Sequence, residues 1–304
     1  MRFNPGGGNP FSGVASLAFL AVACMVLAPL SLTAQRVPRR VFVSATDAAG
    51  RPVLNLTRAD LEVTENGVPR EVTRVALGTA PLRIVLLVDS STSIDPMLNT
   101  VRAALIEFVE TLPPQHEVAF ISSGGQLRVR TAPSTDRQKL KQEIGVFASA
   151  GGANAFLDTL IESDKRFLKT APGQWQTLVI VTTDKGETRR EMPLNQYNAF
   201  MNDFVSRGGA AHAVVLRGNQ TGPVTDMTQN LVENVLGLYS EISTEVSLPE
   251  RMRAIAERLA GDHERMENKY EVEFTGDARA GQPIVNVIAR REGVTLEMSG
   301  RRPF

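Results

Sequence analysis

Short apolar runs that alternate with helical patterns constrain this fold more than any other feature of the sequence. Residues 84–88, 177–183 and 210–216 are almost unbroken in apolar or β-branched side chains, as expected of strands that are covered on both faces. Apolar side chains recur at helical spacing between these runs, and again over residues 224–238. Strands that alternate with helices predict an α/β fold, with a doubly wound, mostly parallel sheet and helices on both faces.

Segments on both sides of this region have β character instead. In residues 37–78, β-prone runs flank Asn66-Gly67, a strong hairpin signal. Residues 268–304 contain further short β-prone runs. Each segment holds too few strands to be stable alone, and the two ends of an inserted domain often lie close together. We therefore expect the two segments to form one small flanking β-sandwich.

Residues 1–34 are not expected to belong to the fold. They contain a long apolar run that ends in small residues suited to cleavage after Ala34, which is typical of a secretory signal peptide. The run is also long enough to span a bilayer, so an uncleaved N-terminal anchor in the membrane is the alternative. Either one predicts an exported protein that is periplasmic, at the cell surface or extracellular. The one cysteine, Cys24, lies in this leader, so the fold must depend on core burial rather than on a disulfide.

The charge of the chain is balanced, with 33 basic and 33 acidic side chains. Domains that bind nucleic acid usually carry a strong excess of basic residues on one face. No basic block occurs in this sequence. Composition therefore argues against a nucleic-acid partner.

Polar oxygen atoms follow two of the apolar runs. Asp89, Ser91 and Ser93 form an Asp-x-Ser-x-Ser pattern after the first run, and Asp184 follows the second. Parallel strands end at the same edge of a sheet, where open α/β sheets bind ligands. Two carboxylates at that edge repel each other unless a cation lies between them, and hard oxygen ligands suit Mg²⁺, or Mn²⁺ or Ca²⁺. The alternative is an ordinary loop in which Ser91 or Ser93 caps the next helix.

In these residues the chain resembles a von Willebrand factor A domain, which has a Rossmann-like fold. In that family, Asp-x-Ser-x-Ser forms the metal-ion-dependent adhesion site. The resemblance therefore implies that Asp89, Ser91 and Ser93 bind a metal ion, together with Asp184 from the later strand. It assigns the domain to residues 82–265.

The family also supplies a threonine ligand from a Gly-rich loop, and here this chain departs from the pattern. The corresponding loop is Gly151-Gly152-Ala153-Asn154, and spacing back from Asp158 puts Asn154 at the threonine position. An asparagine carbonyl is a competent ligand for Mg²⁺ or Ca²⁺. Asn154 is therefore a candidate ligand in place of the threonine.

The resemblance extends to the flanking segments. Asp47-Ala48-Ala49-Gly50 and Glu65-Asn66-Gly67 are similar to the start of a bacterial secreted subfamily, the VWFA-related domain proteins, and Gly293-Val294-Thr295-Leu296 is similar to its end. The resemblance implies a binding module in which the cation recognises a carboxylate on a protein partner.

Two other functions remain open from the sequence. A metal-assisted hydrolase would need a general base near the metal. Glu187 is the only close candidate in sequence and is expected to face solvent, so we expect no enzyme. A structural envelope protein with a degenerate, metal-free site is the other alternative. His116, His212 and His263 lack metal-ligand spacing, and we expect them to be ordinary surface or strand histidines.

Overall fold

The computed structural model describes residues 36–171, 173–184, 193–217, 222–266, 268–280 and 283–299. The leader lies outside these residues, so the choice between a signal peptide and an anchor stays a prediction. Glu187 and the C-terminal residues 300–304 also lie outside them. Within the described residues, no helix combines the length and the apolar character that crossing a bilayer requires.

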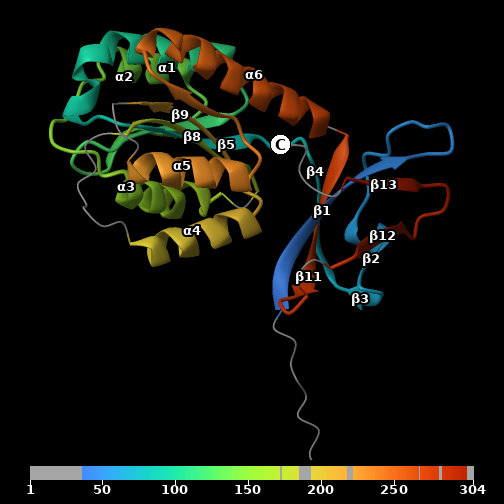
Figure 1. The fold of residues 1–304 in the computed structure, drawn as a ribbon. Coiled ribbons are helices and arrows are strands. Elements are labelled where there is room, and N and C mark those ends of the chain that lie inside the picture. Colours follow the sequence, from blue (N-terminus) through green and yellow to red (C-terminus); the bar gives the residue numbers. More distant parts are fainter. Residues whose placement is uncertain are drawn as a thin grey trace, which may run out of the picture. The chain divides into compact units, whose positions relative to one another are not determined.

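A mostly parallel sheet forms the middle of the chain, as the apolar runs predict (Figure 1). Its strand order is β10-β9-β8-β5-β6-β7, and among these strands β7 runs antiparallel to its neighbour β6. Every residue of β8 and β9 is buried, which explains why their sequences are largely apolar. The strands are β5 (Leu82–Val88), β6 (Glu117–Ser122), β7 (Arg128–Ser134), β8 (Trp175–Thr183), β9 (Ala210–Leu216) and β10 (Tyr239–Ile242).

Helices cover both faces of this sheet (Figure 1). Alternate side chains of β5 enter two separate cores: Leu86 packs in the core under α1, α2 and α6, and Leu87 in the core under α3, α4 and α5. The doubly wound α/β fold is thus confirmed. The helices are α1 (Leu98–Thr111), α2 (Arg137–Gly145), α3 (Phe156–Ser163), α4 (Leu194–Ser206), α5 (Pro223–Asn234) and α6 (Leu248–Met266). Shorter helical turns are η1 (Arg58–Asp60), η2 (Thr92–Met97), η3 (Asp164–Leu168, a π-helical turn) and η4 (Glu245–Ser247).

The flanking segments form two antiparallel sheets, and each sheet combines strands from both segments. One has the order β13-β1-β11-β4 and the other the order β12-β2-β3. Side chains from both sheets, including Val43, Val63 and Phe274, share one hydrophobic core, which confirms the predicted β-sandwich. The strands are β1 (Arg36–Thr46), β2 (Leu61–Glu65), β3 (Val68–Arg70), β4 (Val72–Leu77), β11 (Lys269–Asp277), β12 (Val285–Ala289) and β13 (Thr295–Ser299).

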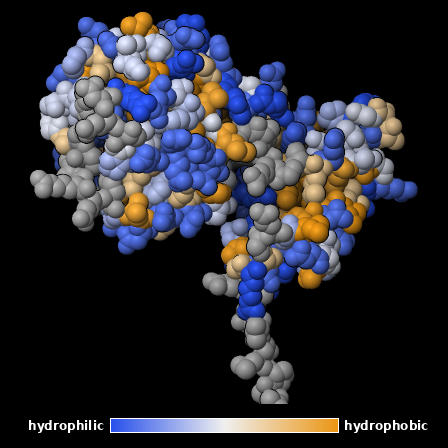
Figure 2. Space-filling model, in the orientation of Figure 1, coloured by the Kyte–Doolittle hydropathy of each residue, from blue (hydrophilic) through white to orange (hydrophobic). Residues whose placement is uncertain are grey.

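The hydropathy of the surface differs between the two kinds of sheet. Figure 2 shows mostly hydrophilic residues over the helices in this view, and apolar residues gathered over the antiparallel strands. Val68, Ile284 and Ile288 are among the exposed apolar residues of those strands and their loops.

The prediction of one helix over residues 224–238 is wrong at its C-terminal end. Helix α5 ends at Asn234. Residues 235–238 then lead into β10, which pairs with β9 at the edge of the sheet. Leu236 has a φ of 57°, which a right-handed helix does not allow. Gly237 lies so close to the main chain that a Cβ there would stand 1.7 Å from the carbonyl oxygen of Ala211.

The expectation of ordinary surface or strand histidines is confirmed for His212 and wrong for His116 and His263. His116 and His263 are buried, and their ring centroids lie 4.7 Å apart. His212 lies in β9, as a strand histidine, and is buried too. All three rings are hydrogen-bonded to the backbone. His116 accepts from the amide nitrogen of Leu82, and His212 accepts from that of Leu238. The ring of His263 is hydrogen-bonded to the carbonyl oxygen of Ala80.

Candidate metal centre

The carboxyl ends of β5 and β8 lie side by side because the two strands pair in parallel, with Val88 opposite Val181. Asp89 directly follows β5, and Asp184 directly follows β8. The backbone nitrogen of Asp89 donates to the carbonyl oxygen of Val181 at 2.8 Å, which extends the pairing by one residue. The fold therefore brings the two aspartates to the same edge of the sheet.

The carboxylate of Asp89 is buried, with 2% of the residue exposed. Its Oδ1 accepts a hydrogen bond from the backbone nitrogen of Ser91 at 2.7 Å. Its Oδ2 accepts from the hydroxyl of Thr183 at 2.5 Å and from the backbone nitrogen of Thr183 at 3.3 Å. Burial raises the pKa of Asp89, and the hydrogen bonds from Thr183 and Ser91 oppose this shift only in part. All of these partners are neutral.

The two serines lie in the turn that follows Asp89. Ser91 is buried and is the N-cap of η2, where its Oγ accepts a hydrogen bond from the backbone nitrogen of Ser93 at 3.3 Å. A hydroxyl has two acceptor lone pairs and one donor. The capping role considered in the sequence therefore exists, and it leaves a lone pair of Ser91 available for a cation. Ser93 is half-buried.

The Gly-rich loop is hydrogen-bonded to this same turn. The backbone nitrogen of Ala150 donates to the carbonyl oxygen of Ser90 at 2.7 Å, and that of Thr92 donates to Gly152 at 3.2 Å. Gly151 and Gly152 have φ angles of 74° and 71°, which residues with a Cβ rarely adopt. The glycines thus allow the loop to fold back over the turn that carries the serines.

Asn154 is fully buried, and both ends of its amide are hydrogen-bonded to neighbouring side chains. Its Oδ1 accepts from the hydroxyl of Ser123 at 2.6 Å, and its Nδ2 donates to the hydroxyl of Thr182 at 2.9 Å. The side chain therefore joins the ends of β6 and β8. Because an amide oxygen has two lone pairs, the bond from Ser123 leaves one for a cation.

Sequence reasoning overlooked the threonines that precede Asp184. Thr183 binds the carboxylate of Asp89, and Thr182 binds Asn154. Their side chains alternate along β8, so neighbouring residues reach two different polar groups of the site. The signal was present in the sequence as two hydroxyl residues in front of an aspartate at the end of an apolar run.

The chemistry of these donors fits a hard divalent cation. The residues that the sequence selects offer carboxylate, hydroxyl and amide oxygens, which Mg²⁺ and Ca²⁺ prefer and soft metals do not. Within the described part of the chain, no group of three or more His, Cys, Asp or Glu side chains is placed to hold a metal ion. A metal at this edge would therefore depend on hydroxyl oxygens as well as on the two carboxylates.

Comparison with known proteins supports the fold. Residues 84–188 match the family model of the von Willebrand factor type A domain. No curated protein matches the chain. Among solved structures, von Willebrand factor type A from Catenulispora acidiphila is similar over 88% of this chain and 74% of its own, with 15% identity and a TM-score of 0.54.

Two further solved structures resemble this chain less well. The conserved hypothetical protein BatB from Bacteroides thetaiotaomicron matches 59% of this chain and 99% of its own, with 12% identity and a TM-score of 0.47. Proximal thread matrix protein 1 from the mussel byssus, with zinc in its metal-ion-dependent adhesion site, matches 67% of this chain and 49% of its own, with 12% identity and a TM-score of 0.48. Residues 84–188 therefore match a von Willebrand factor type A domain, and the likeness to the solved structure from Catenulispora acidiphila shows the fold.

Proposed function

We propose that this domain holds a divalent cation, Mg²⁺ or in its place Mn²⁺ or Ca²⁺, and uses it to bind an acidic side chain of a partner protein. Asp89 and Asp184 supply the negative charge, Ser91 and Ser93 supply hydroxyl oxygens, and Asn154 supplies its amide oxygen. A carboxylate of the partner completes the coordination, because a cation of this kind takes six or more oxygen ligands. The protein acts in this proposal as an exported binding module and not as an enzyme.

One observation carries the proposal, and it concerns the partners of Asp89. A buried carboxylate costs free energy unless a cation or a set of hydrogen bonds compensates its charge. In the described part of the chain, Asp89 receives hydrogen bonds from backbone nitrogens and hydroxyls, and no lysine or arginine pairs with it. A bound divalent cation supplies the missing positive charge.

A second candidate function is a structural envelope protein whose site binds no metal. The hydrogen bonds of Asn154 to Ser123 and Thr182 favour it, because both ends of this amide are already satisfied within the protein. In that case Asp89 is stabilised by its neutral partners alone. Calorimetry with metal ions separates the two candidates.

The test is isothermal titration calorimetry of the intact protein with MgCl₂, MnCl₂ and CaCl₂. We expect one ion per molecule and a loss of affinity of at least tenfold in Asp89→Asn, because that change removes a charged ligand. Asp136→Asn is the matched control. Asp136 is the N-cap of α2, far along the chain from the site, and asparagine caps helices equally well.

No heat with any of the three ions overturns the proposal and supports the metal-free alternative. Equal affinities of the wild type and Asp89→Asn also overturn it, because the cation then binds elsewhere. The partner is tested by a pull-down from the native envelope with and without EDTA. We expect the captured protein to leave the beads when EDTA is added.

A further inference from the structure

The two ends of the Asn154 side chain differ in what they offer a cation. The amide oxygen Oδ1 has lone pairs that bind a cation, whereas the amide nitrogen Nδ2 carries two N–H donors and no free lone pair. The two ends have almost the same shape, so their hydrogen-bond partners decide which way the amide faces. Asn154 therefore serves as a ligand only if the protein fixes the direction of its amide, a choice that the threonine of the family does not face.

Ser123 does not fix this direction. It directly follows β6, and its backbone nitrogen donates to the carbonyl oxygen of Val88 at 3.1 Å, which places it beside the start of the turn that carries Asp89. Its hydroxyl donates to Oδ1 of Asn154 at 2.6 Å. Because a hydroxyl both donates and accepts, Ser123 would bind Nδ2 of a reversed amide equally well.

Thr182 distinguishes the two ends of the amide. Its hydroxyl donates its one proton to the carbonyl oxygen of Thr183 at 3.3 Å, so it acts toward Asn154 as an acceptor, and Nδ2 donates to it at 2.9 Å. A reversed amide would place Oδ1 against this acceptor, and the proton of Thr182 would have to leave the carbonyl oxygen. Thr182 is 2% exposed, so solvent does not replace a lost hydrogen bond there. The hydroxyl of Thr182 therefore keeps Nδ2 on its own side and Oδ1 on the side of Ser123.

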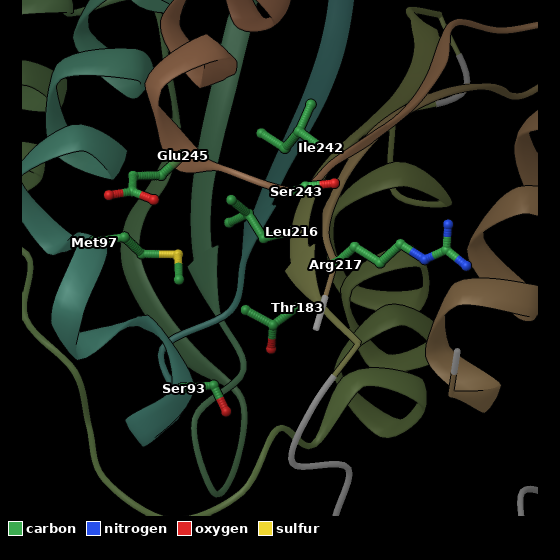
Figure 3. Close-up of a pocket in the computed structure, with 8 residues that line it drawn as sticks. All are labelled: Ser93, Met97, Thr183, Leu216, Arg217, Ile242, Ser243 and Glu245. Atoms are coloured by element: carbon green, nitrogen blue, oxygen red, sulfur yellow. The ribbon is translucent and has the colours of Figure 1, made fainter. Parts of the chain in front are cut away.

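The residue that accepts the proton of Thr182 also holds another proposed ligand. The carbonyl oxygen of Thr183 accepts from Thr182, while its hydroxyl and backbone nitrogen donate to Oδ2 of Asp89. Figure 3 shows the hydroxyl of Thr183 pointing toward the turn that carries Ser93. The last two residues of β8 are thus hydrogen-bonded to each other and to two of the proposed ligands, Asp89 and Asn154.

We propose that Thr182 is a positioning residue of the metal centre, which keeps the amide oxygen of Asn154 available to the cation. The inference rests on the proposed function, in which Asn154 is a ligand. Thr182 makes asparagine an oxygen ligand at a position where the family has threonine. Ser123, by contrast, occupies a lone pair of the same oxygen and does not decide its direction.

The test removes the two hydroxyls that bind Asn154, one at a time, and measures the affinity for MgCl₂ by calorimetry on the intact protein. Thr182→Val keeps the shape of the side chain, and the affinity should fall about tenfold, the scale expected when a residue that orients a ligand is lost. Ser123→Ala should bind as tightly as the wild type or up to about fivefold more tightly, because it frees a lone pair of Oδ1 for the cation. Thr182→Ser should restore the affinity. A merely structural bridge predicts that Thr182→Val and Ser123→Ala weaken binding alike.

A second readout uses the metal-free protein. In ¹⁵N-labelled protein in EDTA, the side-chain amide signals of Asn154 are assigned by their absence from Asn154→Thr. Thr182→Val should shift these signals and speed their hydrogen exchange, because Nδ2 loses its acceptor, whereas Ser123→Ala should keep the exchange slow. Thr177→Val is the matched control. Thr177 is also a buried threonine of β8, and within the described residues its hydroxyl makes no hydrogen bond, so both readouts should stay unchanged.

The outcomes separate this inference from the proposed function. Equal affinities of Thr182→Val and the wild type, or an equal loss in Thr182→Val and Ser123→Ala, overturn the inference and leave the function standing. If Thr182→Val does not fold, a loss of affinity in Ser123→Ala or in Thr182→Ser overturns the inference by itself. Absence of Mg²⁺ binding by the wild type overturns the proposed function and the inference together.

Discussion

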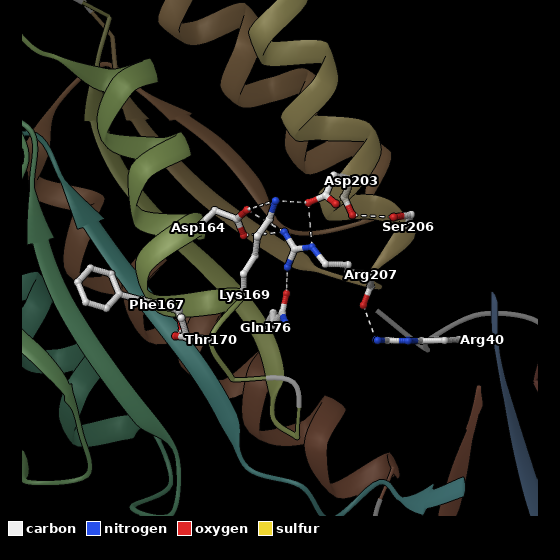
Figure 4. Close-up of polar contacts among 9 residues, drawn as sticks. All are labelled: Arg40, Asp164, Phe167, Lys169, Thr170, Gln176, Asp203, Ser206 and Arg207. Carbon is white, nitrogen blue, oxygen red and sulfur yellow. Dashed lines mark hydrogen bonds and ion pairs between the residues drawn. The ribbon is translucent and has the colours of Figure 1, made fainter. Parts of the chain in front are cut away.

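The two edges of the central sheet compensate buried charge in different ways. At the edge where the strands begin, Asp164 is 2% exposed, and the guanidinium of Arg207 contacts both of its carboxylate oxygens at 2.7 and 2.8 Å (Figure 4). At the edge where the strands end, Asp89 is equally buried at 2%. Its partners among the described residues, however, are the neutral donors of Ser91 and Thr183.

The cluster around Asp164 is complete without any ligand. Arg207 also binds the carboxylate of Asp203 at 2.9 Å and the side-chain oxygen of Gln176. Lys169 binds Asp203 at 2.9 Å. Figure 4 shows these groups converging from neighbouring elements. The comparison teaches that burial alone does not mark a functional carboxylate. What makes Asp89 the candidate ligand is that it is buried and has no cationic partner among the described residues.

Removal of the Asp164 carboxylate should have the largest effect on stability. Asp164→Ala leaves Arg207, whose side chain is 18% exposed, without its main partner. Breaking a buried pair in this way costs about 3–5 kcal/mol. In the absence of metal, Asp89→Asn should change the free energy of unfolding by about 1 kcal/mol or less, because asparagine keeps most of the hydrogen bonds and removes a buried charge. Urea unfolding of both variants in EDTA measures the difference.

The comparison breaks if the two variants are equally destabilised in EDTA. Asp89 would then be a structural carboxylate like Asp164. Addition of MgCl₂ sharpens the test further. Saturating Mg²⁺ should stabilise the wild type and Asp164→Ala alike, and should stabilise Asp89→Asn less, by about 1.4 kcal/mol for a tenfold loss of affinity, because the gain depends on how tightly the native state binds the ion.

A smaller effect is expected at His116, which also lies at the edge where the strands begin. Burial, together with the charges of His263 and Arg137, lowers the pKa of His116 to about 4. The unfolded chain binds a proton near pH 6.5, so it gains protons before the folded protein does. The free energy of unfolding should therefore fall as the pH drops from about 6.5 to about 4, by at most about 3 kcal/mol from this residue.

Urea unfolding at pH 7, 5.5 and 4 tests this contribution in the wild type and in His116→Asn. Asparagine removes the titration, and its side-chain oxygen can accept the hydrogen bond that Leu82 now donates to Nδ1 at 3.2 Å. We expect the variant to lose less stability than the wild type over this range. Burial also lowers the pKa of His212, to about 3, so some acid sensitivity should persist in both. Equal pH profiles would show that His116 does not titrate in this range.

Local patterns predicted the parts of the fold that depend on local chemistry. Strand β9 occurs at the expected residues, and β5 and β8 begin two residues before the expected ones, because a strand that is buried on both faces must be largely apolar. Strand β10 was missed because it lies at the edge of the sheet and its sequence, Tyr-Ser-Glu-Ile, is half polar. The end of α5 was also missed, because Leu236 at a positive φ resembles no usual helix stop.

The site was predictable only where its residues follow strands. Asp89 and Asp184 could be placed together because parallel strands end at one edge. The pairing of Asp164 with Arg207 joins residues 43 apart and follows no motif. The buried ring of His116 likewise accepts a hydrogen bond from Leu82, which is 34 residues away in the sequence. Contacts of this kind are set by packing between elements and leave no local pattern in the sequence.

The smallest effect is expected from Asn154→Thr, which tests how completely the edge where the strands end is built for a cation. Threonine also offers a hard oxygen, so the affinity for Mg²⁺ should change less than tenfold. Asn154 is hydrogen-bonded to both Ser123 and Thr182, and the single hydroxyl of threonine cannot contact both. The free energy of unfolding of the metal-free protein should therefore fall by about 1 kcal/mol. Calorimetry and urea unfolding in EDTA measure the two quantities. A metal affinity that changes by more than tenfold would show that Asn154 and threonine are not equivalent as ligands. An unchanged stability of the metal-free protein would show that the hydrogen bonds of Asn154 are not what holds β6 and β8 together at this edge.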